Sequence, residues 1–353
     1  MDSVAVDAAK IPADFSMSGS SVLIAESALH YAQKFDAALD SLFFIRLSQD
    51  GYRNASFLDD RVLATGMEGR WIGYSEVATA MRDASDARPL HFIFHTGHVG
   101  STLLSRLIDE ASGVLGLREP LPLRTLAELQ DQNAPQLDTR LATFLKLWRR
   151  GFDDTTHVVL KATSSSGRLA TRLLRASPKS KAVYLNLRAE PYLATLLAGA
   201  NAMVDLNGFG AERASRLAKH FGIALAPWTS LSVGELAAMS WAAESLTRAE
   251  TKAAFPDRVL LLDFDALLLD WRAGLAGVSD AFAIRVSDGF LAGIEKSAVL
   301  TRYSKAPEQY AYSPLLRSQL LRQARREQAA ELNKGLRWLE GLAKQDSRVA
   351  AIL

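Results

Sequence analysis

The stretch LHFIFHTGHVGST, residues 90–102, decides the fold. Its first six residues form a short apolar and aromatic run, which is typical of a buried β-strand. Gly97 and Gly100 follow within a few positions, and an amphipathic pattern then begins at Ser101. Gly113 stands where a glycine commonly ends a helix. The stretch therefore predicts a strand, a glycine loop and a helix, in that order.

Later segments repeat this alternation of strand and helix. Four further runs have strand character and are separated by helical segments; they are residues 114–117, 157–161, 182–187 and 259–263. Strands that alternate with helices are connected by crossovers and so pair in parallel. We therefore predict an α/β fold with a mainly parallel, doubly wound sheet.

The chain divides near residue 88. Residues 22–47 have apolar positions at helical spacing, which predicts a helix and a mainly helical amino-terminal extension over residues 1–88. Residues 89–353 are then the α/β domain, with a helical carboxyl-terminal segment. We detect no internal repeat in the 353 residues.

Composition excludes several classes of function. The 41 Lys and Arg residues nearly balance the 39 Asp and Glu residues, and aromatic residues make up 8%, so we expect no nucleic-acid partner. The chain has no cysteine, which excludes disulfides and thiolate chemistry. Residues 1–19 lack the pattern of a secretory signal, so we expect a cytoplasmic location. The most apolar run, residues 259–269, contains two aspartates and is too short for a membrane span.

The glycine loop is a candidate anion site. A helix that starts after such a loop presents unpaired N–H groups and the positive end of its dipole at one point. Gly97 and Gly100 allow close backbone approach, and Ser101 and Thr102 place hydroxyls at the helix start. A purely structural turn between strand and helix is the alternative.

Two nucleotide chemistries remain open for such a loop. The ATP-binding form needs a lysine that reaches the phosphates, and no lysine lies between Gly97 and Arg106. Residues 259–263 nevertheless end in Asp263, which is a possible Mg²⁺ ligand. An NTP-dependent phosphotransferase is therefore an alternative, and so is a non-catalytic nucleotide-binding protein.

Residues 97–102, GHVGST, resemble the 5′-phosphosulfate loop of the P-loop sulfotransferase superfamily, whose common form is Pro-[Arg/Lys]-Ser-Gly-Thr-Thr. The resemblance continues in the same order along the chain. Residues 114–120 match a strand that ends in a glutamate, residues 181–191 match a lysine, strand and Arg-Asp-Pro segment, and residues 259–267 match a later strand with an acidic element. Together these segments span roughly residues 89–310.

This resemblance implies a three-layer P-loop fold and a sulfotransferase. The donor would be 3′-phosphoadenosine-5′-phosphosulfate (PAPS), the acceptor a hydroxyl or amine of a small molecule or peptide, and no metal would be required. The loop residues that would hold the donor's phosphosulfate are Gly97, His98, Val99, Gly100, Ser101 and Thr102.

The resemblance also assigns residues outside the loop. Glu119 would be the general base, and Arg188 would hold the 3′-phosphate. Thr195 stands one position before the family's usual serine. Arg302 and Lys305 lie where the family has a carboxyl-terminal loop over the nucleotide, so they could contact the 3′-phosphate.

All three candidate catalytic residues carry alternatives. Glu119 could instead lie in a surface turn with Arg118. His98 stands where the family has Arg or Lys; a bound anion would favour its imidazolium form as a cation or acid, but it could simply shape the loop. Lys161 ends a strand before the hydroxyl-rich residues 162–167, which suit sulfate oxygens or could cap a helix. We expect no metal at His91, His95 and His98, because the first two share a strand and no carboxylate motif accompanies them.

Local charge favours an anionic ligand. Residues 140–190 contain eleven Lys and Arg residues against three Asp and Glu residues. The residues that would choose the acceptor carry no chemical signature, because such pockets are built from variable loops.

Overall fold

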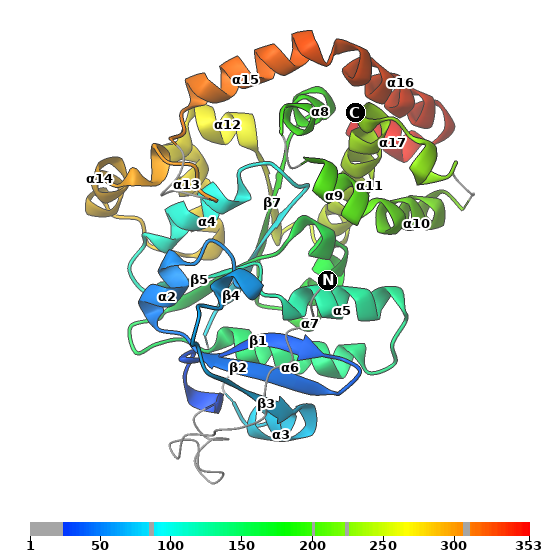
Figure 1. The fold of residues 1–353 in the computed structure, drawn as a ribbon. Helices are drawn as coiled ribbons and strands as arrows, with labels where there is room; N and C mark the ends of the chain where they lie inside the picture. The colour runs from blue at the N-terminus through cyan, green and yellow to red at the C-terminus, as the bar shows by residue number, and fades with distance from the viewer. Residues whose placement is uncertain (1–23, 85–87, 200–201, 223–225, 306–310) are drawn as a thin grey trace.

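The computed structural model describes residues 24–84, 88–199, 202–222, 226–305 and 311–353. They contain two β-sheets (Figure 1). The first is antiparallel, with the order β1 (His30–Asp36), β2 (Ser41–Arg46), β3 (Gly69–Gly73). The second has the order β5 (Val114–Arg118), β6 (His157–Lys161), β4 (Leu90–His95), β7 (Ala182–Asn186), β8 (Val259–Asp263).

The second sheet confirms the predicted α/β fold. Each pair of neighbouring strands in it is parallel, and each strand matches its predicted range to within one residue. Strand β4 lies at the centre and is buried along its whole length, as expected for a parallel strand covered on both faces. The chain leaves β4 toward β5 on one side and leaves the adjacent β6 toward β7 on the other side, so the loops after β4 and β6 separate at the point where ligands bind in such sheets.

Helices cover both faces of the parallel sheet and continue to the end of the chain. They are α2 (Gln49–Asn54), α3 (Tyr74–Ala80), α4 (Ser101–Asp109), α5 (Pro122–Asp131), α6 (Leu137–Arg149), α7 (Ala170–Ala176), α8 (Ala189–Ala198), α9 (Ala202–Gly208), α10 (Gly210–Phe221), α11 (Val233–Ala254), α12 (Phe264–Leu269), α13 (Trp271–Phe282), α14 (Asp288–Lys296), α15 (Pro314–Glu327), α16 (Ala329–Gln345) and α17 (Ser347–Ile352). The described residues from Pro314 to Ile352 form the three helices α15, α16 and α17. Four 3₁₀ turns, Asp60–Val62, Ser164–Leu169, Trp228–Ser230 and Ala298–Leu300, complete the described elements.

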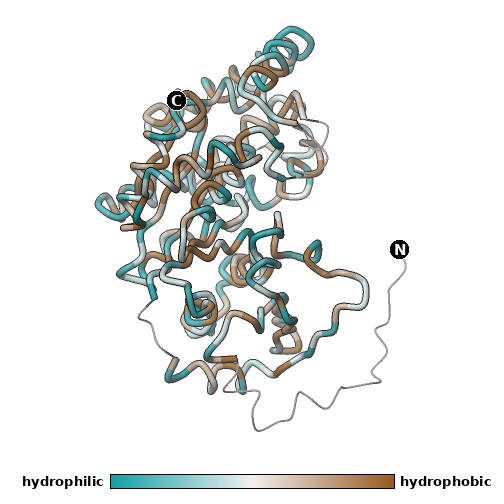
Figure 2. The backbone as a smooth tube through the Cα atoms, turned by 90° about the vertical axis from the view of Figure 1, so that its left-hand side faces the viewer, coloured by the Kyte–Doolittle hydropathy of each residue, from teal (hydrophilic) through white to brown (hydrophobic). Residues whose placement is uncertain are grey.

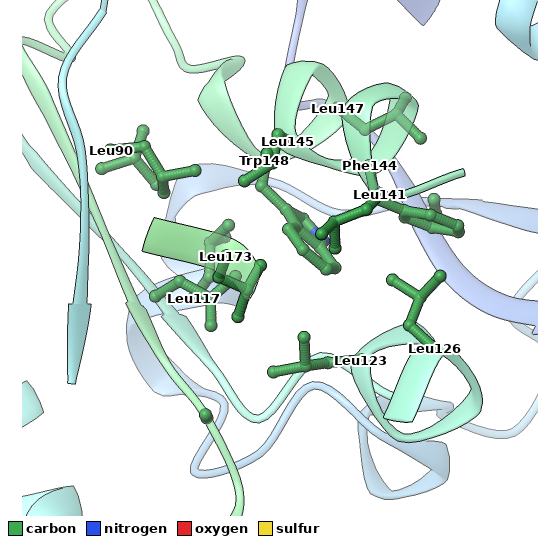
Figure 3. Close-up of a cluster of buried hydrophobic side chains, with 14 of the residues drawn as sticks. Leu90, Leu117, Leu123, Leu126, Leu141, Phe144, Leu145, Leu147, Trp148 and Leu173 are labelled. Atoms are coloured by element: carbon green, nitrogen blue, oxygen red, sulfur yellow. The ribbon is translucent and has the colours of Figure 1, made fainter. Parts of the chain in front are cut away.

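Each face of the parallel sheet packs into its own hydrophobic cluster. Phe92 and Phe94 of β4 point into a cluster that contains residues of α5, α6 and α7, whereas Ile93 points into one that contains residues of α4, α8, α11 and α13. Figure 3 shows part of the first cluster, with Leu123 and Leu126 of α5 on one side and Leu141 and Phe144 of α6 on the other. This alternation follows from the two-residue period of a strand. Figure 2 shows that hydrophobic and hydrophilic residues also alternate around the turns of the helices.

The predicted helix over residues 22–47 is wrong where the structure describes it. This part of the chain forms β1 and β2, and the extension as a whole is a three-stranded sheet with short helices, not a mainly helical segment. The register of β1 shifts between Ala32 and Lys34, so Gln33 forms a bulge. A bulge interrupts the two-residue alternation, and the apolar positions then resemble helical spacing. Residues 1–23 lie outside the described residues.

The extension and the α/β part share one core. Phe35 of β1 packs against Phe144 of α6 with ring centroids 5.4 Å apart, and both belong to the first hydrophobic cluster. The domain boundary at residue 88 stays a prediction. Within the described parts of the chain, no helix has the length and apolar character needed to cross a membrane.

Candidate active site at the edge of the parallel sheet

A cavity of about 580 Å³ lies beside the carboxyl ends of β4 and β5. Its lining includes the predicted residues His98, Val99, Gly100, Ser101, Thr102, Glu119, Thr195 and Lys305. These residues are far apart in the sequence and come from the glycine loop, the end of β5, helix α8 and the carboxyl-terminal region. The structure therefore brings most of the predicted site to one place.

The loop between β4 and α4 is shaped by positive backbone angles. Gly97, His98 and Gly100 have φ values of 92°, 52° and 69°. A side chain on Gly100 would collide with the ring of Phe264, so both the angle and the available space require glycine there. Gly113 was expected to end α4, but the helix ends at Asp109, and Gly113 lies in the turn before β5 with φ 76°.

The first turn of α4 faces the cavity. Ser101, Thr102 and Leu103 line it, and their N–H groups stand at the start of the helix, where they have no partner within the helix. Thr102 is 2% exposed, and its hydroxyl has no hydrogen-bond partner among the described residues. A buried hydroxyl without a partner costs free energy, and an anion oxygen placed there would satisfy it.

His95 is held neutral beneath the loop. Its Nδ1 accepts a hydrogen bond of 3.1 Å from the Gly97 N–H, so its Nε2 carries the proton and donates to the Ala162 carbonyl at 2.9 Å. Burial, reinforced by Lys161, lowers the pKa of His95 to about 3. His95 therefore braces the loop as a neutral ring, a role that the sequence pattern did not indicate.

Glu119 and Lys161 form a buried ion pair between neighbouring strand ends. The Glu119 N–H donates to the Lys161 carbonyl at 2.8 Å, and the Lys161 ammonium donates to Oε1 of the Glu119 carboxylate. Burial of Glu119 is the largest single influence and favours its neutral form, but Lys161, His95 and Lys305 together outweigh it and lower the pKa of Glu119. Burial lowers the pKa of Lys161 to about 8, with Glu119 opposing the shift. Both groups are thus charged at pH 7.

His98 is a neutral residue in the unliganded loop. Burial, reinforced by Lys305, lowers its pKa to about 4, although Asp205 lies 3.9 Å from its Nε2. The positive charge expected from His98 is therefore absent before an anion binds. Lys305 lines the same cavity and brings an ammonium group to it.

Four predicted residues do not line the cavity. Lys161 is fully buried behind Glu119, and Gly97 is a buried residue of the loop itself. Arg188 is exposed at the residue that precedes α8, and Arg302 is exposed and pairs with Ala311 in a short bridge. The structure thus leaves the expected 3′-phosphate ligand Arg188 outside the cavity wall.

The hydroxyl-rich segment after Lys161 is buried and does not cap a helix through its side chains. Ser164 begins a 3₁₀ turn without a side-chain cap, and Ser165 bonds Thr163 at 2.9 Å. Helix α7 likewise starts without a side-chain cap. The alternative that these serines cap a helix is therefore wrong.

The carboxyl-terminal region forms the opposite wall, most of which the sequence pattern did not reveal. Its lining residues are Tyr303, Ser304, Lys305, Ala311, Tyr312, Leu316, Arg317, Leu320 and Leu321. We call residues 302–305 the strap. Arg317 donates to Asp265 at 2.7 Å and lies over the Phe264 ring at 5.1 Å. The spacing of Leu316, Leu320 and Leu321 predicts that they share one face of a helix, but it does not predict which part of the chain that face contacts.

Asp263 and the histidines show no metal-site geometry. Asp263 accepts a hydrogen bond of 3.0 Å from Ala266 N–H and so caps α12. His91 stacks on Phe282 with centroids 4.6 Å apart. In the described ranges, no three His, Asp or Glu side chains are grouped to hold a metal ion.

Comparison with known proteins gives matches only among solved structures. No family model matches the chain, and no curated protein matches it. The sulfotransferase domain from the curacin biosynthetic pathway is 15% identical, with TM-score 0.41 over 73% of this chain and 99% of that chain. A sulfotransferase from Mycobacterium tuberculosis H37Rv is 12% identical, with TM-score 0.39 over 72% and 81%. The sulfotransferase domain of the Synechococcus PCC 7002 olefin synthase is 14% identical, with TM-score 0.35 over 68% and 96%.

Proposed function

We propose that this chain is a sulfotransferase that moves the sulfuryl group of PAPS to a hydroxyl or amine acceptor. The observation that carries the proposal is the cavity in which the unpartnered Thr102 hydroxyl, the first turn of α4 and the Glu119 carboxylate meet. A helix start that faces a cavity suits a phosphosulfate group. The resemblance of residues 97–102 to the 5′-phosphosulfate loop points to PAPS as the donor.

The residues available for the donor fit its charges. The loop N–H groups with Ser101 and Thr102 would hold the phosphosulfate oxygens, and Lys305 would supply the positive charge that neutral His98 does not. For the 3′-phosphate, Thr195 lines the cavity, whereas Arg188 and Arg302 would have to reach it from exposed positions. Guanidinium groups bind phosphate in a bidentate manner, so we retain both as proposed ligands.

The chemistry requires one proton acceptor and charge stabilisation. The Glu119 carboxylate takes the proton of the acceptor hydroxyl or amine as that oxygen or nitrogen attacks sulfur. The bond from sulfur to the bridging oxygen of the donor phosphate breaks, and its electron pair stays on the leaving adenosine 3′,5′-bisphosphate. Positive charge and N–H groups already in place around that phosphate lower the barrier.

Lys161 would act through Glu119. Its ammonium is fully buried and contacts the carboxylate, not the cavity. We therefore assign it the role of a positioning residue that keeps Glu119 ionised, in place of the direct catalytic role expected from the sequence.

The test is incubation with PAPS labelled in its sulfate and a panel of phenols, alcohols and amines. We expect label in at least one acceptor, and Glu119→Gln should lower turnover at least 100-fold while leaving affinity for adenosine 3′,5′-bisphosphate unchanged. Equal losses of turnover and nucleotide affinity would contradict the role of Glu119 as base. Transfer of phosphate from ATP with Mg²⁺ would instead support the phosphotransferase alternative.

A further inference from the structure

We propose that the amino-terminal extension is a working part of the site: its residues 52–59 hold the strand end that carries Glu119, and Arg124 positions the Glu119 carboxylate while Asp59 anchors Arg124. Only the use of Glu119 as a base rests on the proposed function. The positioning itself is a property of the folded chain and is testable without turnover.

The backbone of Glu119 needs external support. Its φ of 56° lies in the left-handed region, although Glu119 is not a glycine and precedes Pro120. Such a conformation costs free energy and persists only where the surroundings impose it. The contacts that surround residues 118–121 are therefore the place to look for what holds the carboxylate in the cavity.

The first support is Arg118, the residue before Glu119. Its fully buried guanidinium donates to the carbonyls of Ala55 and Arg53, both at 2.7 Å, and to that of Tyr52. A 2.8 Å ion pair with Asp109 of α4 completes its contacts. The Arg118 side chain thus connects the end of α2 both to β5 and to α4.

The same segment also pairs with the backbone around Glu119. The Leu58 N–H donates to the Arg118 carbonyl at 2.7 Å, and the Leu121 N–H donates to the Leu58 carbonyl at 3.4 Å. Leu58 therefore bonds the chain on both sides of Glu119. The extension supplies a short stretch of pairing at an edge of the parallel sheet, where β5 has a partner only in β6.

The second support acts on the carboxylate. Arg124 of α5 lies 3.6 Å from Oε2 of Glu119, while Lys161 bonds Oε1. The same nitrogen of Arg124 donates to Asp59 Oδ2 at 3.2 Å. Cations on both carboxylate oxygens leave the group little freedom to rotate, and Asp59 fixes the second cation.

The Phe57 ring packs beside the charged groups of Lys161 and Arg61. Its ring centroid lies 5.5 Å from the Lys161 ammonium and 3.5 Å from the Arg61 guanidinium. Arg61 also donates to Asp59, at 2.8 Å through Nε, but has a side chain that is 55% exposed. Arg61 and Arg124 thus share one carboxylate, and only Arg124 is placed to act on Glu119.

The charged and titratable groups around Glu119 come from every element packed against it. They are His95 from β4, His98 from the loop, Lys161 from β6, Arg124 from α5 and Lys305 from the strap. Removal of the Arg124 charge takes away one cation, so the carboxylate becomes easier to protonate. The pKa of Glu119 should then rise.

The experiment compares Arg124→Gln with Arg61→Gln, which loses an ion pair to the same Asp59. The Glu119 carboxyl is followed by ¹³C NMR between pH 3 and 7 in the full chain, and its signal is assigned by its loss in Glu119→Gln. We expect Arg124→Gln to raise the pKa of Glu119 by about half a unit or more, Arg124→Lys to restore most of the difference, and Arg61→Gln to change it by less than half as much.

Binding of adenosine 3′,5′-bisphosphate to the same variants separates this inference from the proposed function. Arg124 does not line the cavity, so Arg124→Gln should keep the wild-type affinity. An unchanged Glu119 pKa in Arg124→Gln, or an equal shift in Arg61→Gln, would overturn the positioning role. Failure of the wild-type chain to bind the bisphosphate would refute the proposed function and leave the NMR result valid.

Discussion

Glu119 and His98 share an unusual backbone. Five non-glycine residues in the described ranges have positive φ. Two of them, His98 after β4 and Glu119 after β5, line the same cavity. A non-glycine residue with positive φ raises the free energy of the folded chain, so the surrounding structure must hold it in place. Their meeting at one cavity therefore supports a site that is shaped for a ligand.

Gly100 should be intolerant of any side chain. We expect Gly100→Ala to lower the free energy of unfolding by about 2–4 kcal/mol, because a positive φ and a collision with Phe264 add together. Gly222→Ala is a matched control, because Gly222 has φ 70° and no atom near its missing side chain. Urea unfolding measures both, and equal losses would show that the contact with Phe264 has no effect.

The pH dependence of turnover should have an alkaline limb. Because the pKa of Lys161 is lowered to about 8, Lys161 loses its charge as the pH rises through that value. Glu119 then loses the charged partner that holds its Oε1 in place, so turnover should fall above about pH 8. A rate profile with an identified acceptor measures this, and activity that stays constant up to pH 10 would contradict the role of Lys161.

The elements around the cavity are joined by one arginine of α4. Arg106 donates to the Ser56 hydroxyl at 2.8 Å and to the Ser304 carbonyl at 2.9 Å. It therefore links the extension to the strap that carries Lys305. Helix α4 therefore connects two regions that are far apart in the sequence.

Loss of Arg106 should loosen the strap. We expect Arg106→Met to weaken binding of adenosine 3′,5′-bisphosphate about 10-fold, since a hydrogen bond to a charged group is worth about 1.5–3 kcal/mol and the strap is only one wall. Arg322→Met on α15 is a suitable control, because within the described residues Arg322 bonds only Ser318 of its own helix. Calorimetry should show near-native affinity in the control, and a parallel loss in both variants would contradict the account.

Sequence patterns predict the elements whose signals are local. The strand at residues 90–95 and the loop after it follow from a buried apolar run and paired glycines, and both are confirmed. The β1–β2 hairpin is missed because the bulge at Gln33 changes the apolar phase. The cavity wall from α15 and the contacts of Arg118 are also missed, because tertiary packing decides which helix face meets the loop and which carbonyls a buried arginine reaches.

At the scale of the whole molecule, the extension and the α/β part behave as one body in their packing. Side chains of both parts meet in the first hydrophobic cluster, and Arg118 joins the two parts through carbonyl contacts. The near-zero net charge of the whole chain is also an average. It includes a local excess of positive charge in residues 140–190, the stretch that contains Lys161. The sequence therefore predicts a local anion site but not the shared core that supports it.

A shared core should unfold in one step. We expect hydrogen exchange under increasing urea to release peptides from β1–β2 and from β4–β7 at the same midpoint, because neither part retains its buried surface alone. An earlier midpoint for the extension would show that residue 88 is a true boundary between independently stable units.

Calorimetric titration of the full chain with adenosine 3′,5′-bisphosphate, and separately with ATP plus Mg²⁺, tests the central claim most directly. The cavity beside the α4 start is proposed to hold the PAPS product through Ser101 and Thr102. The account predicts one-site binding of the bisphosphate without metal, at least 10-fold weaker in Thr102→Val, and little binding of ATP. Binding of ATP with Mg²⁺ that is tighter than that of the bisphosphate, or no binding of either, would contradict it.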